Sequence, residues 1–483
     1  MNQDTLPLYN GILSHLKKEP ISFHVPGHKS STVFPPLNQN VFNEILKIDQ
    51  TELRGLDDLH SASGIIKEAQ DLTAALYNVR KSYFLVGGST AGNLAMILST
   101  CEQNDIVLVQ RNSHKSIING LKLANVQPVF LKPEYDEVGH FTTNVSYKTI
   151  KDAIKTYPDA RVLILTSPNY YGVVSQELHE IIKLAHSKGL VTLIDEAHGA
   201  HFILGEPFPP SAVELGADIV VQSAHKTLPA MTMGSFLHIN NPQIDIEKVQ
   251  YFLQVIQSSS PSYPILASLD IARYYLAHIT EKEKMSIVNN IDEFHEELST
   301  IPQLAIIKNE GNDYKTDPLK LIIQTNCPLS GYELQKELEN QSIFSELADP
   351  YNVLFVLPLT AEGDWVGISQ KIKQLLEHLP VQAISKKTTK SINIIANTAT
   401  LAVTYQEMKE CKKLMVPVEQ SVGSIAATSI IPYPPGIPLL LEGEKITANH
   451  IERLLFLKAT GAYFQNGNDI WDRGIEVLKY QST

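Results

Sequence analysis

Between about residues 72 and 240, short apolar runs alternate with segments whose apolar residues recur at helical spacing. This alternation is typical of a mostly parallel sheet covered by helices, and strands buried on both faces need not alternate in polarity. One helical segment, residues 178–189, ends at Gly189, a common helix stop. The pattern therefore predicts an α/β fold. Seven runs are predicted to be its strands: residues 82–88, 105–110, 127–132, 161–168, 190–197, 218–224 and 235–239.

The pattern of apolar and helix-like segments changes after about residue 285. Long helix-like stretches there surround two apolar runs, residues 319–325 and 352–359, which predicts a smaller α+β domain. A further piece begins near residue 416. We therefore expect four parts: an N-terminal segment (1–70), a large domain (71–285), a small α+β domain (286–415) and a C-terminal domain (416–483).

Composition narrows the possible functions. The 483 residues carry a formal net charge of −12, and the 40 Lys and Arg residues form no runs, so we expect no nucleic-acid partner. Three widely spaced cysteines, Cys101, Cys327 and Cys411, indicate neither a disulfide framework nor a zinc site and fit a reducing cytoplasm. The polar N-terminus and the lack of an apolar run of about 18 residues lead us to expect a protein that is neither exported nor membrane-embedded.

Two motifs at predicted strand ends carry candidate chemistry. Lys226, in SAHKT, follows an apolar strand, where it could form a Schiff base from a fixed backbone position, although a solvated loop lysine is the common alternative. Asp195, in DEAHGAHF, ends another strand and could pair with a protonated ring nitrogen or simply cap a helix. A metal site using Asp195, His198 and His201 matches no known zinc spacing, and none is expected.

Two further motifs follow predicted strands. GGSTAGN (87–93) places a Gly-Gly turn, Ser89 and Thr90 at a helix start, which suits a phosphate, although a capped turn is also possible. It lacks the lysine of a nucleotide P-loop. RNSHKS (111–116) offers His114, whose ring could stack on an aromatic cofactor or be purely structural. All four motifs lie at the carboxyl ends of predicted strands, where a parallel sheet gathers ligand-binding residues.

The order of these motifs resembles the pyridoxal-phosphate (PLP) dependent ornithine/lysine/arginine decarboxylases of the bacterial, aminotransferase-like type, in the short form without a wing domain. The resemblance spans nearly the whole chain. It rests on FHVPGHK (23–29), LDDLHSASGIIKEAQ (56–70), GSTAGNLAMI (88–97), RNSHKS (111–116), TSPNYYGVV (166–174), DEAHGAHF (195–202), QSAHKTLPA (222–230), SSSPSYPILASLD (258–270) and IPYPPGIPLL (431–440).

The resemblance implies PLP as the cofactor and assigns the catalytic residues. Lys226 would hold PLP as a Schiff base, Asp195 would pair with the ring nitrogen, and His114 and Ala197 would sandwich the ring. Either Lys226 or His114 would protonate Cα, and the sequence leaves that choice open. Contacts to the rest of the cofactor are implied for Ser89, Thr90, Ala91, Ser223 and His225 at the phosphate side, for His198 near the ring hydroxyl, and for Ser258 at a phosphate in the neighbouring subunit.

The same resemblance implies decarboxylation of arginine, lysine or ornithine to an amine and CO2 in polyamine-related metabolism, by a homodimer or higher homo-oligomer. The N-terminal segment would contribute to the active site and to oligomer contacts. The sequence departs from the family pattern before Gly88, near Ala62, near Met233 and Gly234, and at Glu442. The changes near Met233 and Glu442 leave substrate preference open. Another PLP enzyme on the same fold (an aminotransferase, aldolase or lyase) and a catalytically silent homologue are the alternatives.

Overall fold

The computed structural model describes the chain except residues 36–40, 309–312, 383–395, 434–435, 466–468 and 480–483. The described residues form two compact units, each built from separated stretches of sequence. The first unit comprises residues 1–100 and 192–281, and the second comprises residues 101–191 and 282–483.

The strands of the first unit run in the order β1–β10–β9–β8. β10 is antiparallel to both of its neighbours, whereas β8 and β9 are parallel. Their burial is nearly complete because helices cover them, which is why the sequence of each reads as a continuous apolar run. The bounds are β1 Lys81–Leu85, β8 Val191–Asp195, β9 Ile219–Gln222 and β10 Ser235–Ile239.

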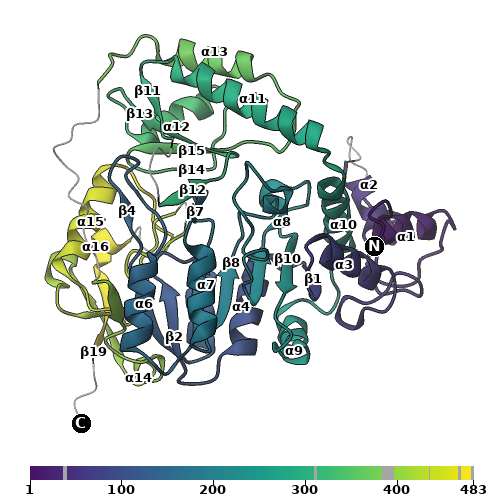
Figure 1. Ribbon diagram of the computed structural model, residues 1–483, viewed down its shortest axis with the longest axis horizontal. Coiled ribbons are helices and arrows are strands. Elements are labelled where there is room, and N and C mark those ends of the chain that lie inside the picture. The colour runs from purple at the N-terminus through teal and green to yellow at the C-terminus, as the bar shows by residue number, and fades with distance from the viewer. Residues whose placement is uncertain (36–40, 309–312, 383–395, 434–435, 466–468, 480–483) are drawn as a thin grey trace. The chain divides into compact units, whose positions relative to one another are not determined.

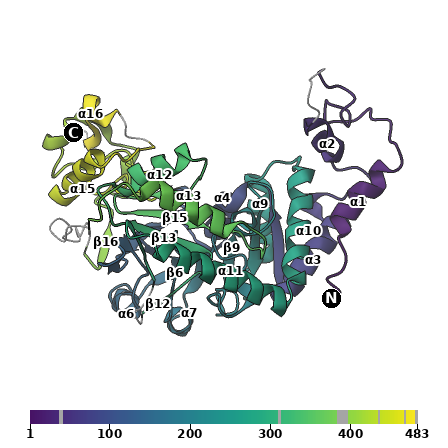
Figure 2. The ribbon, with the colours of Figure 1, turned by 90° about the horizontal axis from the view of Figure 1, so that it is seen from above.

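Helices α1, α3 and α10 of the first unit pack against one another, as Figure 2 shows. Helix α4 runs beside α9 and contacts strands β1, β9 and β10. The bounds in this unit are α1 Pro7–Leu16, α2 Val41–Ile48, η1 Leu59–Ser61, α3 Ile65–Leu76, α4 Gly88–Thr100, η2 Phe202–Leu204, α8 Ala224–Thr227, α9 Ile246–Ile256 and α10 Tyr263–His278.

The second unit holds strands in the order β6–β2–β3–β16, in which β2 is parallel to both neighbours and β16 is antiparallel to β3. Helices α6 and α7 lie side by side next to these strands (Figure 1). The bounds are β2 Ile106–Gln110, α5 Lys115–Leu123, β3 Gln127–Leu131, β4 Tyr135–Asp136, β5 Phe141–Thr142, α6 Tyr147–Thr156, β6 Ala160–Thr166, β7 Val173–Ser175, α7 Leu178–Ser187 and β16 Thr398–Thr400.

A second, antiparallel sheet in this unit has the order β11–β13–β15–β14. Helices α11, α12 and α13 lie over it (Figure 1). The bounds are α11 Glu281–Ser299, β11 Leu304–Ile306, β12 Tyr314–Thr316, β13 Lys320–Thr325, α12 Gly331–Asn340, β14 Leu347–Ala348, β15 Asn352–Val356 and α13 Trp365–Leu376.

The end of the chain adds a three-stranded sheet, β17–β19–β18, with its own apolar core around α15. Leu454 and Leu457 of α15 and Phe464 are buried in that core. The bounds are α14 Tyr405–Met408, β17 Lys412–Val416, η3 Val418–Gln420, β18 Ile425–Ala426, α15 Ala448–Ala459, α16 Ile470–Arg473 and β19 Ile475–Lys479.

The predicted α/β class is confirmed, and each of the seven predicted strands corresponds to a strand of the structure: β1, β2, β3, β6, β8, β9 and β10. The predicted runs at 319–325 and 352–359 contain β13 and β15. β16 was not predicted, because its sequence TAT carries no apolar run. The expected four-part division of the chain stays a prediction.

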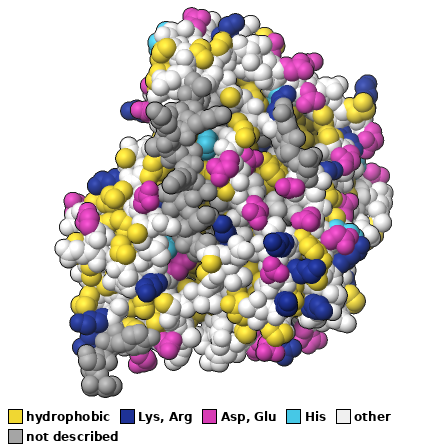
Figure 3. Space-filling model, turned by 60° about the vertical axis from the view of Figure 1, so that its left-hand side comes forward, with side chains coloured by type: hydrophobic (Ala, Val, Ile, Leu, Met, Phe, Trp, Pro, Cys, Tyr) yellow, Lys and Arg dark blue, Asp and Glu magenta, His cyan; other side chains and the backbone are white. Residues whose placement is uncertain are grey.

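Three further observations complete the description. On the face drawn in Figure 3, acidic and basic side chains are interspersed. Across the described ranges, no helix has the length and apolarity that crossing a membrane requires. Cys101, Cys327 and Cys411 are free thiols.

A buried ion pair anchors the N-terminal segment to α10. Arg273 and Asp270 are fully buried, and the Arg273 guanidinium donates to Asp270 Oδ1 at 2.6 Å. Arg273 also donates to the Gln3 and Thr5 carbonyl oxygens, while Asp270 Oδ2 accepts from the Leu8 amide at 3.1 Å. Each charge thus compensates the other and also satisfies backbone groups at the start of α1.

We predict that Arg273→Met lowers the free energy of unfolding by about 3–5 kcal/mol, because it leaves a buried carboxylate without its cation. Urea denaturation followed by circular dichroism measures the effect. Lys67→Met, which removes the exposed pair with Asp71, is the matched control and should cost less than about 1 kcal/mol. Equal effects of the two substitutions would contradict the anchoring role.

Candidate active site

Asp195 is the last residue of β8, and its carboxylate is held in place from two sides. It is only 2% exposed. Its Oδ2 accepts a hydrogen bond from Asn93 Nδ2 at 2.9 Å, and its Oδ1 accepts from the Ala197 amide at 3.2 Å. Burial raises the pKa of Asp195, whereas the charge of Lys226 and these two hydrogen bonds act in the opposite direction. A buried carboxylate of this kind is suited to a cationic partner.

Lys226 lies in the short helix α8, directly after β9. Its Nζ is 3.0 Å from His198 Nε2, and its amide donates to the Ser223 carbonyl at 3.1 Å. His198, three residues beyond Asp195, is 3% exposed. The ends of β8 and β9 therefore bring Asp195, His198 and Lys226 together, as the strand-end positions of their motifs predicted.

A group of hydroxyls gathers at the start of helix α4. The Ser89 and Ser223 hydroxyls are 2.7 Å apart, and Ser89 Oγ donates to Ser235 Oγ at 3.4 Å. The first amides of a helix have no intrahelical acceptor, so those of α4 are available to an anion. Gly88 begins the helix with φ of +73°, a conformation that favours glycine. The motif GGSTAGN thus brings the start of helix α4 and the Ser89 hydroxyl together, an arrangement that we call the cradle. Its use by a phosphate stays a prediction.

Three other predicted residues also lie in the first unit. Ala91 is buried in the first turn of α4. The Ala197 carbonyl accepts from the Ser223 amide at 3.2 Å, which ties the end of β8 to the end of β9. The His225 amide donates to the Gly234 carbonyl at 3.1 Å.

His114 and Ser258 are placed differently. His114 belongs to the second unit, where it caps α5 and its Nδ1 accepts from the Ser116 amide at 3.3 Å. Ser258 follows α9, is exposed, and accepts through its carbonyl from His60 Nε2 at 2.8 Å. Stacking of His114 on the cofactor and a contact from Ser258 to a neighbouring subunit therefore stay predictions from the resemblance.

Asn93 is a site residue that the sequence interpretation missed. It occurs within GGSTAGN, four residues after Ser89, so helical periodicity alone places both on one face of α4. Asn93 and Asp195, the partners of this hydrogen bond, are 102 residues apart in the sequence. No local sequence pattern could have indicated that they meet.

Glu196, the neighbour of Asp195, is a second missed residue. Its carboxyl accepts from the Ser211 hydroxyl at 2.7 Å, the Ala212 amide at 2.6 Å and the Gln222 amide at 2.6 Å. Burial nevertheless raises the pKa of Glu196 to about 8. The Glu196 side chain thus connects the end of β8 to β9 and to the loop at residues 211–212.

The metal site considered from the sequence would need the side chain of His201 beside those of Asp195 and His198. His201 is fully buried and packs edge-on against the rings of Phe202 and Phe208. No group of three His, Cys, Asp or Glu side chains suited to a metal ion occurs in the part of the chain that the structure describes.

These residues fit PLP. The cradle at α4 suits its phosphate, Asp195 suits its ring nitrogen, and Lys226 suits its carbonyl. The Thr227 hydroxyl, beside Lys226 in sequence, is buried and has no hydrogen-bond partner among the described residues, so a donor remains for a ligand. The fold and the site together define the class as PLP-dependent enzymes of the aminotransferase-like fold, and PLP is the cofactor.

Comparisons with known proteins identify the family within this class. The model for the Orn/Lys/Arg decarboxylase major domain matches residues 6–311, and the model for the Orn/Lys/Arg decarboxylase C-terminal domain matches residues 382–466. The chain therefore belongs to the Orn/Lys/Arg decarboxylase family, and the resemblance noted from its motifs is confirmed.

Individual relatives agree with this assignment. The chain is 46% identical to the uncharacterized protein YaaO of Bacillus subtilis, over 98% of each chain. It is 31% identical to an arginine decarboxylase of the same species, over 100% of this chain and 99% of the relative. The crystal structure of the Francisella novicida lysine decarboxylase LdcF matches with a TM-score of 0.82 at 19% identity, over 99% of this chain and 81% of that chain, and supports the fold.

We predict that Asn93→Ala weakens PLP binding by about tenfold, because a hydrogen bond to a charged group contributes about 1.5 kcal/mol or more and Asp195 loses that bond. Fluorescence titration of the apoprotein with PLP measures the dissociation constant. The control is Ser99→Ala, on the same helix, whose hydroxyl donates only to the Met96 carbonyl of its own helix. Unchanged PLP affinity in Asn93→Ala would show that Asn93 does not position Asp195.

Proposed function

We propose that this protein removes the α-carboxylate of a basic L-amino acid, releasing CO2 and the corresponding amine. Membership of the Orn/Lys/Arg decarboxylase family supports the reaction class. The observation that carries the proposal within the structure is the grouping of the buried residues Asp195 and His198 with Lys226 at the ends of β8 and β9. Polyamine-related metabolism remains the predicted setting.

Each residue has a proposed task. When bound, PLP supplies an electron-accepting ring that takes up the electron pair left behind as CO2 departs. Asp195 keeps a proton on the ring nitrogen, because its buried carboxylate favours a cationic neighbour. Asn93 and the Ala197 amide fix the direction of the Asp195 carboxylate. His198 accepts a hydrogen bond from Lys226 Nζ and so orients the amine that holds the cofactor covalently.

The cradle has the complementary task of binding the phosphate. Ser89 and Ser223 offer adjacent hydroxyls, and Thr90 and Ala91 offer amides at the start of α4. Proton delivery to Cα by Lys226 or by His114 remains a proposal. So does stacking of His114 and Ala197 on opposite ring faces.

Arginine is the substrate that the comparisons favour among arginine, lysine and ornithine. Relatives named arginine decarboxylase are 31–32% identical over nearly the full chain, whereas a lysine decarboxylase of Pseudomonas aeruginosa is 23% identical.

Met233 is a position where the family pattern differs. It has φ of +78° and is partly exposed, and a Cβ on Gly88 would lie 4.0 Å from the Met233 carbonyl oxygen. We infer that the segment at Met233 influences substrate choice from beside the phosphate cradle.

We predict CO2 release from arginine, more slowly from lysine or ornithine, and negligible release from leucine or alanine, because a site built for a cationic tail leaves polar groups unpaired with an apolar substrate. Labelled-CO2 capture and mass spectrometry of the amine provide the measurement. Oxo-acid formation with 2-oxoglutarate but no CO2 would identify an aminotransferase, and neither activity in the PLP-loaded protein would identify a silent homologue.

In the same CO2 assay, Asp195→Asn should retain the fold and lose most of the turnover.

We predict that Lys226 carries the covalent link to PLP, because it is the lysine that shares one strand edge with Asp195. Borohydride reduction of the holoenzyme followed by peptide mapping should find the reduced PLP adduct on Lys226. In Lys226→Arg, reduction should leave no adduct at any lysine. An adduct on another lysine of the unaltered holoenzyme would overturn the assignment.

We propose further that the protein acts as a homo-oligomer. Apolar side chains of the N-terminal segment are unusually exposed in the single chain: Ile21 is 84% and Phe23 93% exposed. Val25, Val33 and Phe42 are each more than 60% exposed. Exposed apolar groups concentrated in one segment favour burial against another protein surface. Cytoplasmic location, expected from the unpaired cysteines, likewise stays a proposal.

We predict that the unaltered protein sediments as a dimer or larger species and that Ile21→Ser/Phe23→Ser shifts it toward the monomer, because both substitutions remove apolar area from the contact. Analytical ultracentrifugation across a concentration series gives the masses. Met285→Ser, which alters an exposed apolar residue on α11, serves as the control and should leave the mass unchanged. A monomeric unaltered holoenzyme would refute the oligomer.

A further inference from the structure

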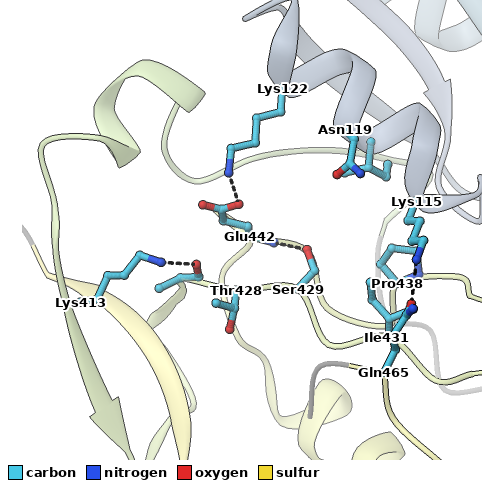
Figure 4. A pocket seen from close by; sticks show the side chains of 12 residues that line it. Lys115, Asn119, Lys122, Lys413, Thr428, Ser429, Ile431, Pro438, Glu442 and Gln465 are labelled. Atoms are coloured by element: carbon cyan, nitrogen blue, oxygen red, sulfur yellow. Dashed lines mark hydrogen bonds and ion pairs between the residues drawn. The ribbon is translucent and has the colours of Figure 1, made fainter. Parts of the chain in front are cut away.

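A polar pocket lies in the second unit, whereas Asp195, Lys226 and the cradle at α4 belong to the first unit. Lys115 of its lining directly follows His114 in the sequence. The volume of the pocket is about 400 Å³, within the range of small-molecule sites. One wall is helix α5, and the other comes from the C-terminal part of the chain (Figure 4). The lining residues are Lys115, Ile118, Asn119, Lys122, Lys413, Ala427, Thr428, Ser429, Ile431, Pro438, Glu442 and Gln465.

Three lysines and a single carboxylate line this pocket. Lys115 and Lys122 come from α5, and Lys413 comes from β17 on the other wall, so the three ammonium groups surround the space from different sides (Figure 4). Glu442 supplies the only negative charge of the lining. The lining therefore carries a net charge of about +2, which favours an anionic ligand.

The present partners of these lysines are exchangeable. Lys115 donates to the Gln465 side-chain oxygen at 3.0 Å, a neutral acceptor. Lys122 pairs with Glu442 at 2.6 Å, and Lys413 pairs at 3.1 Å with Glu476, which lies outside the lining. Both lysine side chains in the ion pairs are nearly half exposed, and such pairs contribute little free energy. An oxyanion in the pocket can therefore replace these partners at small cost.

Neutral polar groups complete the chemistry. Thr428 and Ser429 bring hydroxyls to the same space as Glu442, and Asn119 faces it from α5 (Figure 4). Ile118, Ile431 and Pro438 add apolar groups to the lining. This combination suits a small molecule that carries an oxyanion on a short organic body, and the lining has no aromatic ring on which a base could stack.

We propose that this pocket binds a small multivalent oxyanion of the phosphate-ester or diphosphate class, with Lys115, Lys122 and Lys413 as its cationic ligands. The anion joins α5 to the C-terminal segment, because its ligands come from both walls. Helix α5 begins at the residue after His114, and a Cβ on Gly436 would lie 3.8 Å from His114 Cδ2. Occupancy of the pocket thus steadies the helix that carries His114. The binding site itself does not depend on the proposed decarboxylase activity.

The test uses PLP-loaded full-length protein, so that the phosphate cradle at α4 is filled. Pyrophosphate is the probe, and sodium chloride at matched ionic strength is the control for screening. Isothermal titration calorimetry gives the dissociation constant, and hydrogen exchange reports protection of residues 115–123 and 427–431. The variants are Lys115→Met/Lys413→Met, Glu442→Gln, and the control Lys183→Met, whose exposed lysine lies on α7 outside the pocket.

We expect saturable pyrophosphate binding to the unaltered protein and to Lys183→Met, with protection of both walls. Affinity should fall at least tenfold in Lys115→Met/Lys413→Met and rise several-fold in Glu442→Gln, because that substitution removes the repelling carboxylate. The visible absorbance of bound PLP should stay constant through each titration, which excludes displacement from the cradle. No saturable binding, or equal affinity in all four proteins, would overturn the proposal.

Discussion

The Asp195 carboxylate at the end of β8 is the constraint on which the rest of the active site depends. A charged group that is 2% exposed is costly unless its partners are fixed in advance. Helix α4 supplies Asn93 as one partner, and the chain after β8 turns back so that the Ala197 amide supplies another. The same helix begins with the amides and hydroxyl of the phosphate cradle. In the proposed arrangement, one helix therefore serves both ends of the cofactor, so its position relative to β8 would determine whether they can be bound together.

A second polar network stiffens the sheet beneath that site. The Glu196 carboxyl accepts a hydrogen bond from Gln222 Nε2. Gln222 Oε1 is 3.1 Å from His238 Nε2, and His238 Nδ1 is 2.8 Å from the Ser82 hydroxyl. This chain of contacts runs from the residue that follows β8 through β9 and β10 to β1, which is the spatial order of these strands. Burial lowers the pKa of His238 to about 3, so its ring is neutral and can donate from one nitrogen and accept at the other. The network links all four strands through side chains as well as through backbone bonds.

Local patterns were sufficient for much of this architecture. Apolar runs predicted the seven strands, and the rule that ligands gather at strand carboxyl ends predicted that Asp195 and Lys226 lie close together. Long-range partners were beyond such patterns. Asn93 and Glu196 look like ordinary helix and loop residues until the chain folds, because their partners are distant in sequence. β16 could not be predicted for a related reason: Thr398–Thr400 is a short strand without an apolar run, and its partner β3 is distant in sequence.

The discontinuity of the first unit has a consequence for biosynthesis. Its α4 cradle belongs to residues 1–100, whereas Asp195 and Lys226 belong to residues 192–281, and the whole of residues 101–191 is made between them. Since domains fold as units while the chain emerges from the ribosome, the first unit cannot complete its fold until residues 192–281 have left the exit tunnel. Until then the apolar strand β1 and the amphipathic helix α3 have no completed core to join. While residues 101–191 are being made, the nascent chain therefore exposes apolar surface that the completed first unit buries.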